Sequence, residues 1–420
     1  MLNEHIRAQM REATRTLMSG GAAAATAAIQ KALKGMPGNS GAAISSMPDF
    51  LRDVTLPDMN FTSGKTFGVG EAMPDIVTDL LARLGLPSAD AEWGTGKNPW
   101  QPQTEIQPAD EAQSDAKNGG QFLSKSFTNH AGTRSYKLYV PSSYHGQAMP
   151  LIVMLHGCTQ SPDDFANGTR MNVVAEEKQC LVVYPAQAQS ANSSRCWNWF
   201  KSVDQKREQG EPSIIAGITR EIIRNYKVDA GKVYVAGLSS GGAMAVIMGT
   251  TYPDLYAAVG VHSGLPYASA RDLPSAFAAM RGSVSGSHSQ GQSPAASRAP
   301  SIPIIVFHGD RDMTVNACNG DKLMEQNASE FVFDGHSAAE HTRPDVIVEE
   351  GKVPNGHRYT RTSHHDEGGH AIAEHWVIHG AGHAWAGGSK SGSYTDAKGP
   401  DATREMMRFF YAQSEARQII

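Results

Sequence analysis

The sequence has no excess of basic residues and no long apolar run. Its 420 residues include 37 Lys and Arg against 42 Asp and Glu, which gives a formal net charge of −5. Because no basic stripe is present, a nucleic-acid partner is disfavoured. One of the longest apolar stretches, residues 148–155, includes Pro150, whereas a membrane-spanning helix needs about 20 apolar residues. The sequence therefore predicts neither a nucleic-acid partner nor a membrane span.

Cysteine is also scarce. The four cysteines, at positions 158, 180, 196 and 318, are too few and too dispersed for a disulfide scaffold, and they lack the CxxC pairs of a zinc site. Many of the 16 histidines gather between residues 336 and 383, but their spacing does not converge on a metal ion. We therefore expect no metal site and no other cofactor.

The start of the sequence lacks the pattern of a secretory signal. Four charged side chains between residues 4 and 12 interrupt the place of the apolar run, which favours a cytoplasmic protein. Residues 1–35 show helical spacing, and residues 36–118 are rich in Gly, Pro, Ser, Asp and Asn. We predict a partly helical, weakly structured extension over residues 1–118 and a folded domain over residues 119–420.

From about residue 120, short apolar segments alternate with helical ones. Strands are expected at 135–141, 151–155, 180–185, 233–236 and 304–307, and a hairpin is expected over 356–380. Helices are expected at 162–178, 213–225, 243–250, 317–327 and 401–412. A surface loop is expected at 282–300. Most of the strands are apolar throughout, so both faces of their sheet must be covered, which predicts an α/β sandwich with a mainly parallel central sheet.

One serine lies in a GxSxG motif at the end of a predicted strand. Residues 233–236 (VYVA) lead into 237–241 (GLSSG), and a helical segment of small residues follows. Strand, sharp turn and helix are the context of a nucleophile elbow, in which the helix amides stabilise developing negative charge. Ser239 occupies the central position, so we predict that Ser239 is a nucleophile.

An earlier strand supplies the complementary feature. Residues 151–155 run into His156-Gly157, and the loop after such a strand provides one backbone N–H of an oxyanion hole. The residue after the nucleophile provides the other. By position, these two donors are the N–H groups of Cys158 and Ser240.

An acid and a base should follow the serine in the order Ser, Asp, His. Residues 308–315 (HGDRDMTV) leave a buried strand, and Asp312 fits the pattern HGxxDxxV. Asp310 is better suited to hold the turn or to pair with Arg311. His383 lies on a loop flanked by glycine after a strand. We therefore predict a triad of Ser239, Asp312 and His383 that performs acyl transfer.

Together these motifs resemble the polyhydroxybutyrate (PHB) depolymerase family of esterases, which includes feruloyl and acetylxylan esterases. Further matching stretches are 134–141 (RSYKLYVP), 195–200 (RCWNWF) and 382–388 (GHAWAGG), and the resemblance covers about residues 120–412. It implies the α/β-hydrolase fold for the folded domain, with the same three residues as its triad. It also suggests an exported protein, in contrast to the missing signal.

The resemblance implies two further features. Cys158 and Cys196 would lie close enough for a disulfide beside the oxyanion hole. Trp197, Trp199 and Trp385 would line the acyl cleft, although packing in an aromatic core accounts equally well for each of them.

The expected substrates are hydroxyalkanoate oligomers or similar short-chain esters. Secreted depolymerases of solid polyester carry a C-terminal polymer-binding module, whereas this sequence stops at Ile420, just after its last predicted helix. Three alternatives stay open at this point: a carbohydrate esterase that removes acetyl or feruloyl groups, a hydrolase of another polymer backbone such as a polyamide, and a catalytically silent binding protein on a hydrolase fold. The sequence leaves the oligomeric state open.

Overall fold

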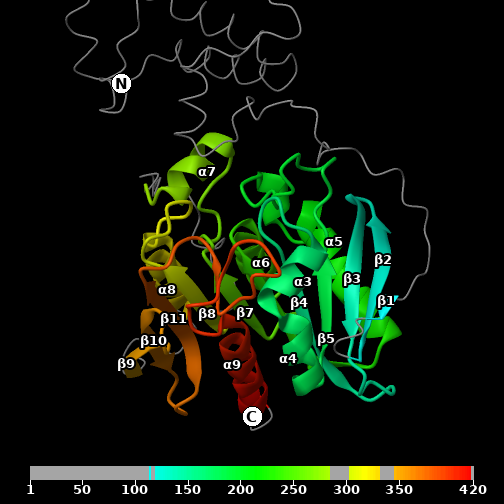
Figure 1. Ribbon diagram of the computed structural model, residues 1–420. Coiled ribbons are helices and arrows are strands. Elements are labelled where there is room, and N and C mark those ends of the chain that lie inside the picture. Colours follow the sequence, from blue (N-terminus) through cyan, green and yellow to red (C-terminus); the bar gives the residue numbers. More distant parts are fainter. Residues whose placement is uncertain (1–112, 115–118, 284–301, 332–344, 418–420) are drawn as a thin grey trace, which may run out of the picture. The chain divides into compact units, whose positions relative to one another are not determined.

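The computed structural model describes residues 113–114, 119–283, 302–331 and 345–417 (Figure 1). The helical spacing expected in residues 1–35 and nearly all of the loop expected at 282–300 lie outside the described residues. The domain boundary between residues 118 and 119 stays a prediction.

Most of the strands form one eleven-stranded sheet, with the order β1-β2-β3-β5-β4-β6-β7-β8-β11-β10-β9, and β12 and β13 form a separate pair. The strands are β1 (Gln113–Ser114), β2 (Gln121–Asn129), β3 (Gly132–Val140), β4 (Met149–Leu155), β5 (Leu181–Pro185), β6 (Val228–Leu238), β7 (Ala258–His262), β8 (Ile304–Gly309), β9 (Asp345–Lys352), β10 (Arg358–His365), β11 (Ala371–His379), β12 (Trp385–Ala386) and β13 (Thr395–Asp396).

The middle of this sheet is parallel. β5, β4, β6, β7, β8 and β11 run in one direction. Antiparallel strands flank them, with β3 beside β5 and β10 beside β11. The predicted sandwich with a mainly parallel sheet is confirmed, and so is the predicted hairpin, which is formed by β10 and β11.

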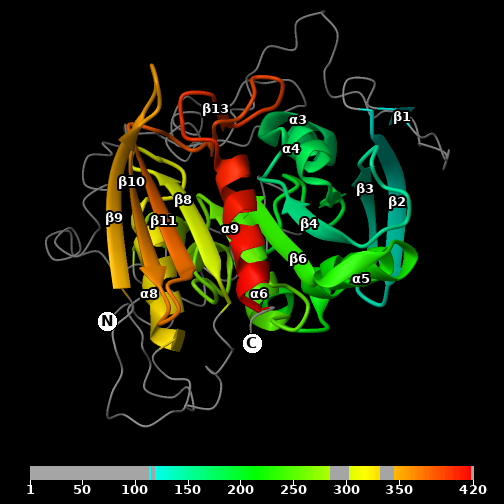
Figure 2. The same ribbon diagram turned by 90° about the horizontal axis from the view of Figure 1, so that it is seen from below.

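Helices cover both faces of the sheet (Figure 2). They are α3 (Pro162–Thr169), α4 (Met171–Lys178), a 3₁₀ turn (Ser202–Gln205), α5 (Gly210–Asn225), α6 (Ser240–Thr251), α7 (Leu273–Met280), α8 (Cys318–Phe331) and α9 (Ala402–Arg417). Buried side chains of α5 and α6 belong to the core on one face, and those of α3, α4 and α9 belong to the core on the other. In the described part of the chain, no helix is long and apolar enough to cross a membrane.

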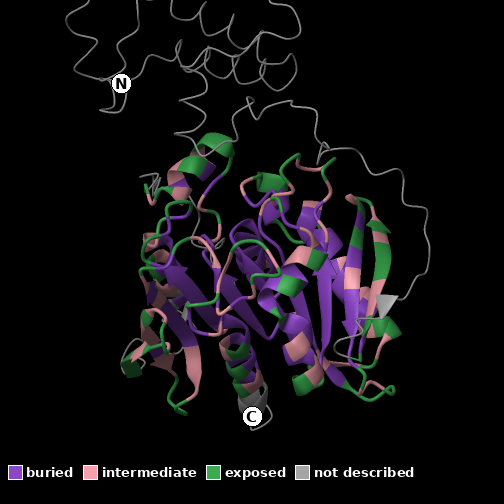
Figure 3. Ribbon diagram, in the orientation of Figure 1, coloured by how far each residue is buried: buried purple, intermediate pink, exposed green. Residues whose placement is uncertain are grey.

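Strand β4 shows why the central strands carry no polar alternation. Leu151, Val153 and Leu155 enter the core beneath α5 and α6, whereas Ile152 and Met154 enter the opposite core. Because successive side chains of a strand point to opposite faces, both sets must be apolar when both faces are covered. The burial is densest in these central strands (Figure 3).

One predicted helix is wrong in its extent. The structure divides the helix expected at 162–178 into α3 and α4 at Arg170, which has a φ of 57° in the left-handed region. The backbone N–H of Arg170 still donates to Ala166 O, and the left-handed conformation of Arg170 then turns the chain out of α3.

The start of α6 lies unusually close to β4. A methyl group on Gly241 would collide with the backbone carbonyl oxygens of Leu155 and His156. Both oxygens belong to the backbone and cannot move without shifting the chain at the end of β4, so only glycine allows this approach. The contact brings the end of β4 beside the turn between β6 and α6.

We predict that Gly241→Ala lowers the free energy of unfolding by about 1–3 kcal/mol, because the added carbon overpacks two backbone groups. Chemical denaturation of both proteins measures this change. Gly231→Ala is the matched control, since its new carbon would lie 3.5 Å from Asp229 Oδ1, an ordinary contact. Equal stability of the two variants would contradict the close approach.

Candidate active site

Ser239 lies in the sharp turn between β6 and α6. Its φ of 58° and ψ of −119° are strained for a residue with a side chain. The backbone holds this conformation because Ser239 N donates to His262 O at 2.9 Å and Ser239 O accepts from Ala243 N. Among the described residues, Ser239 Oγ makes no hydrogen bond. The turn therefore leaves the hydroxyl available at the end of β6.

Asp312 and His383 come from the ends of two neighbouring parallel strands, β8 and β11. His383 Nδ1 donates to Asp312 Oδ2 at 2.7 Å. The carboxylate side chain is fully buried and the imidazole is 11% exposed. Because parallel strands end at the same edge of a sheet, these two loops meet there, at the edge where β6 delivers Ser239.

The Asp312 carboxyl is kept ionised by the groups around it. Burial alone would raise its pKa, but hydrogen bonds from His308 and His383 outweigh that effect and hold the pKa well below its usual range. Its other oxygen, Oδ1, accepts the backbone N–H groups of Thr314 at 2.9 Å and Val315 at 2.8 Å. A carboxylate that accepts several hydrogen bonds is stabilised in its charged form.

The neighbouring carboxylate has a different environment. Asp310 Oδ1 accepts from Gly380 N at 2.7 Å, and Oδ2 accepts from His379 Nδ1 at 3.0 Å. Both side chains of this pair are about two-fifths exposed, at 38% for Asp310 and 42% for His379. Asp310 thus holds the turn after β11, whereas Asp312 contacts His383.

Two backbone donors lie beside the serine. Among the described residues, the N–H groups of Cys158 and Ser240 have no hydrogen-bond partner. The loop that carries Cys158 is adjacent to the elbow, because a methyl group on Gly157 would lie 3.6 Å from Ser239 Cβ. An oxyanion hole needs two such unpaired N–H groups beside the attacking serine, so the assignment of Cys158 and Ser240 stays a prediction.

A second loop, which carries Ser194 and Cys196, is bonded to the loop of Cys158. Cys158 and Cys196 form a disulfide, and Thr159 N donates to Ser194 O at 2.7 Å. Thr159 has a φ of 66° and Arg195 a φ of 53°. Residues other than glycine keep such left-handed conformations only where their surroundings fix them. The disulfide and the hydrogen bond from Thr159 N to Ser194 O together fix both loops here.

Sequence reasoning missed a buried polar cluster behind this corner. Glu211, which is 4% exposed, accepts from both the backbone N and the side chain of Asn198 at 2.7 Å. It also accepts from Gln187 and from Arg134. The members are far apart in the sequence, and the one local signal was an acidic residue in the first turn of a helix.

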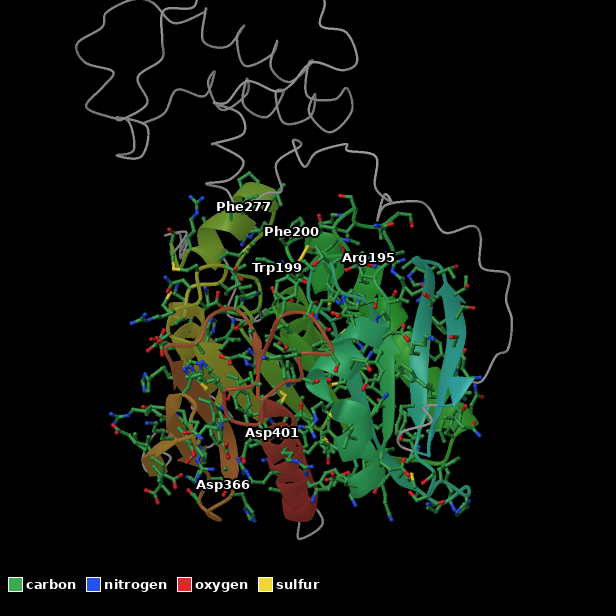
Figure 4. All side chains as sticks on the ribbon, in the orientation of Figure 1. Arg195, Trp199, Phe200, Phe277, Asp366 and Asp401 are labelled. Carbon is green, nitrogen blue, oxygen red and sulfur yellow. A yellow bond between two sulfur atoms is a disulfide. The ribbon has the colours of Figure 1, made fainter. Side chains whose placement is uncertain are left out.

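The three tryptophans are buried. Trp197 is 0%, Trp199 6% and Trp385 1% exposed. Trp197 packs against His156, and Trp385 donates to Thr403 Oγ1. Trp199 lies beside Phe200 at the end of the molecule that carries α7 (Figure 4). Their contact with a substrate stays a prediction. Among the described residues, no three His, Cys, Asp or Glu side chains are grouped as metal ligands.

The profile of the family Esterase PHB depolymerase matches residues 134–346, half of the chain. The chain belongs to this PHB depolymerase esterase family. The matched range includes Cys158, Ser239 and Asp312 and ends before His383.

Similar proteins include members with different named substrates. The chain is 32% identical over 267 residues to poly(3-hydroxyalkanoate) depolymerase C of Paucimonas lemoignei, with 61% of this chain and 59% of that protein covered. It is 34% identical over 140 residues to the probable acetylxylan esterase A of Aspergillus fumigatus, with 33% and 36% covered. The chain thus spans between about a third and three-fifths of the length of these relatives.

A solved structure of an acetyl xylan esterase from Aspergillus awamori is also similar to this chain. It is 21% identical, covers 66% of this chain and 94% of its own, and gives a TM-score of 0.49.

Asp204, next to Glu211, generates a prediction about pH. Burial, and then the charge of Glu211, raise the pKa of the Asp204 carboxyl from its ordinary 3.8 to about 6. Its contribution to stability is therefore complete below pH 3.8 and is lost as the pH rises through 6. Asp204→Asn keeps an oxygen for Glu211 N, which Asp204 Oδ1 accepts at 2.7 Å. We expect this variant to be more stable than the wild type at pH 8 by about 1–3 kcal/mol.

Denaturant unfolding at pH 5 and at pH 8 measures this difference. At pH 5, which lies between the ordinary pKa of 3.8 and the raised pKa of about 6, the stabilisation should fall to roughly half its value at pH 8. A difference that is the same at both pH values would contradict the raised pKa.

Proposed function

We propose that this protein is a serine esterase that uses Ser239, Asp312 and His383 as its triad. The observation that carries the proposal is the 2.7 Å hydrogen bond from His383 Nδ1 to the buried Asp312. It fixes the imidazole with its proton on Nδ1 and leaves Nε2 as the base. Membership of the PHB depolymerase esterase family supports the same chemistry.

The reaction follows from these roles. His383 Nε2 takes the proton of Ser239, whose Oγ attacks the ester carbonyl. The N–H groups of Cys158 and Ser240 donate to the oxyanion of the tetrahedral intermediate, each supplying about 3–4 kcal/mol. Asp312 stabilises the imidazolium, which then protonates the departing alcohol. Water, activated by the same histidine, releases the acid from the acyl-enzyme.

For the substrate, we propose hydroxyalkanoate oligomers or similar short-chain esters. The similarity to poly(3-hydroxyalkanoate) depolymerase C covers 267 residues, the longer of the two similarities described above. A carbohydrate esterase is the second candidate, because a shorter segment of 140 residues is 34% identical to a probable acetylxylan esterase. The triad itself does not select between these esters.

The triad assignment is tested with p-nitrophenyl butyrate. We expect Ser239→Ala to lower kcat/KM at least about 10³-fold and Asp312→Asn about 10³- to 10⁴-fold, because the second change removes the partner that orients His383. Asp310→Asn is the matched control, an adjacent carboxylate that contacts His379 instead, and its loss should stay below about tenfold. A larger loss for Asp310→Asn than for Asp312→Asn would overturn the assignment of the acid.

The substrate class is tested by comparing kcat/KM on hydroxybutyrate trimer, methyl ferulate and acetylated xylan. We expect the trimer to be the best substrate. Faster release of acetate from xylan would favour the carbohydrate esterase instead. A wild type that hydrolyses none of these esters and does not react with a fluorophosphonate probe would contradict the esterase proposal as a whole.

A further inference from the structure

His156 lies directly before the loop of Cys158 and is 1% exposed. Its ring makes two hydrogen bonds to backbone groups. Nε2 accepts from Gln187 N at 3.1 Å, since a backbone N–H can only donate. Nδ1 lies 2.7 Å from Gly157 O, which can only accept. These two partners require a neutral ring with its proton on Nδ1.

The groups around His156 keep its ring neutral and fixed in place. Burial, the largest influence, lowers the pKa of the His156 ring to about 4, so the ring is neutral near pH 7. The Trp197 indole packs on it with centroids 5.7 Å apart, and its Nε1–H donates to His156 O at 3.1 Å. The ring is thus fixed in position as well as in tautomer.

The bond from Nδ1 orients one particular peptide group. The Gly157–Cys158 peptide is trans, so its C=O and its N–H point in opposite directions. Holding Gly157 O against the imidazole turns the Cys158 N–H away from His156. A second donor, Gln160 N, reaches the same oxygen at 3.3 Å, a longer distance than the 2.7 Å from the ring.

Gln187 connects the His156 ring to the loop that carries Cys196. Its backbone N–H holds His156 Nε2, while its side-chain Nε2 donates to Cys196 O at 2.9 Å. Cys196 is the disulfide partner of Cys158. The Gly157–Cys158 peptide is therefore held at Gly157 O by the His156 ring and at Cys158 by the disulfide.

We propose that His156 is a positioning residue, whose Nδ1–H holds Gly157 O and thereby aims the Cys158 N–H at the oxyanion. This inference rests on the proposed esterase function. It predicts that loss of the Nδ1–H weakens stabilisation of the transition state more than binding of the ground-state ester.

The test compares two substitutions, each of which replaces one of the two hydrogen-bonding nitrogens of the ring by an amide group. His156→Asn places an amide N–H near the position of Nδ1, and His156→Gln places an amide oxygen near the position of Nε2. We expect His156→Gln to lower kcat on p-nitrophenyl butyrate about 10- to 100-fold with little change in KM, less than the loss of an entire oxyanion donor. His156→Asn should retain at least about tenfold more kcat than His156→Gln.

His145→Gln, at an exposed position, controls for the loss of a histidine. Thermal unfolding checks that each variant is folded. Equal losses in His156→Asn and His156→Gln, or an unchanged kcat in folded His156→Gln, would overturn the proposal. If neither variant folds, nitrogen NMR of the wild type decides: a proton on Nδ1 at pH 7 supports the proposal, and a proton on Nε2 overturns it.

The rate of covalent labelling by a fluorophosphonate separates this inference from the proposed function, because the phosphonyl oxygen occupies the oxyanion hole. A wild type that is inert on esters but is labelled at Ser239 would contradict the esterase proposal alone. The labelling rate of His156→Gln would then still test the role of His156, with slower labelling than His156→Asn as the expected result. A wild type that is neither active nor labelled would overturn both.

Discussion

The hydrogen bond between His383 and the buried carboxylate of Asp312 depends on the parallel pairing of β8 and β11. A carboxylate without water would be costly in the interior. Here two backbone N–H groups and two imidazoles surround it and keep it ionised. Because the pairing of these strands fixes both loops, the sheet itself sets the distance between the Asp312 carboxylate and the His383 imidazole.

The other half of the site depends on rigid backbone rather than on side chains. Ser239, Thr159 and Arg195 all have positive φ values, and each lies at a corner that hydrogen bonds or the disulfide hold in place. Such strain persists only in an overdetermined structure. The proposed oxyanion donors are backbone N–H groups, so their direction is only as well defined as these corners. We propose that the disulfide, Gln187 and His156 together orient the Gly157–Cys158 peptide group.

Local signals in the sequence predicted what depends on local structure. The GxSxG turn between a strand and a helix located Ser239, and the run of apolar residues at 151–155 located β4. The break at Arg170 carries no such signal, because arginine seldom adopts the left-handed region. Strand β7 was missed because its five residues include Gly260, which lowers strand propensity. The polar cluster around Glu211 was missed because Arg134, Gln187 and Asn198 meet it only in the folded chain.

The central claim is that an acyl group passes through Ser239. Mass spectrometry of the protein, acid-quenched during turnover of p-nitrophenyl butyrate, tests this claim most directly. The account predicts a mass increase of one butyryl group on the peptide that contains Ser239, and its absence in Ser239→Ala. Turnover with a butyryl group on another residue, or with the same adduct in Ser239→Ala, would contradict it.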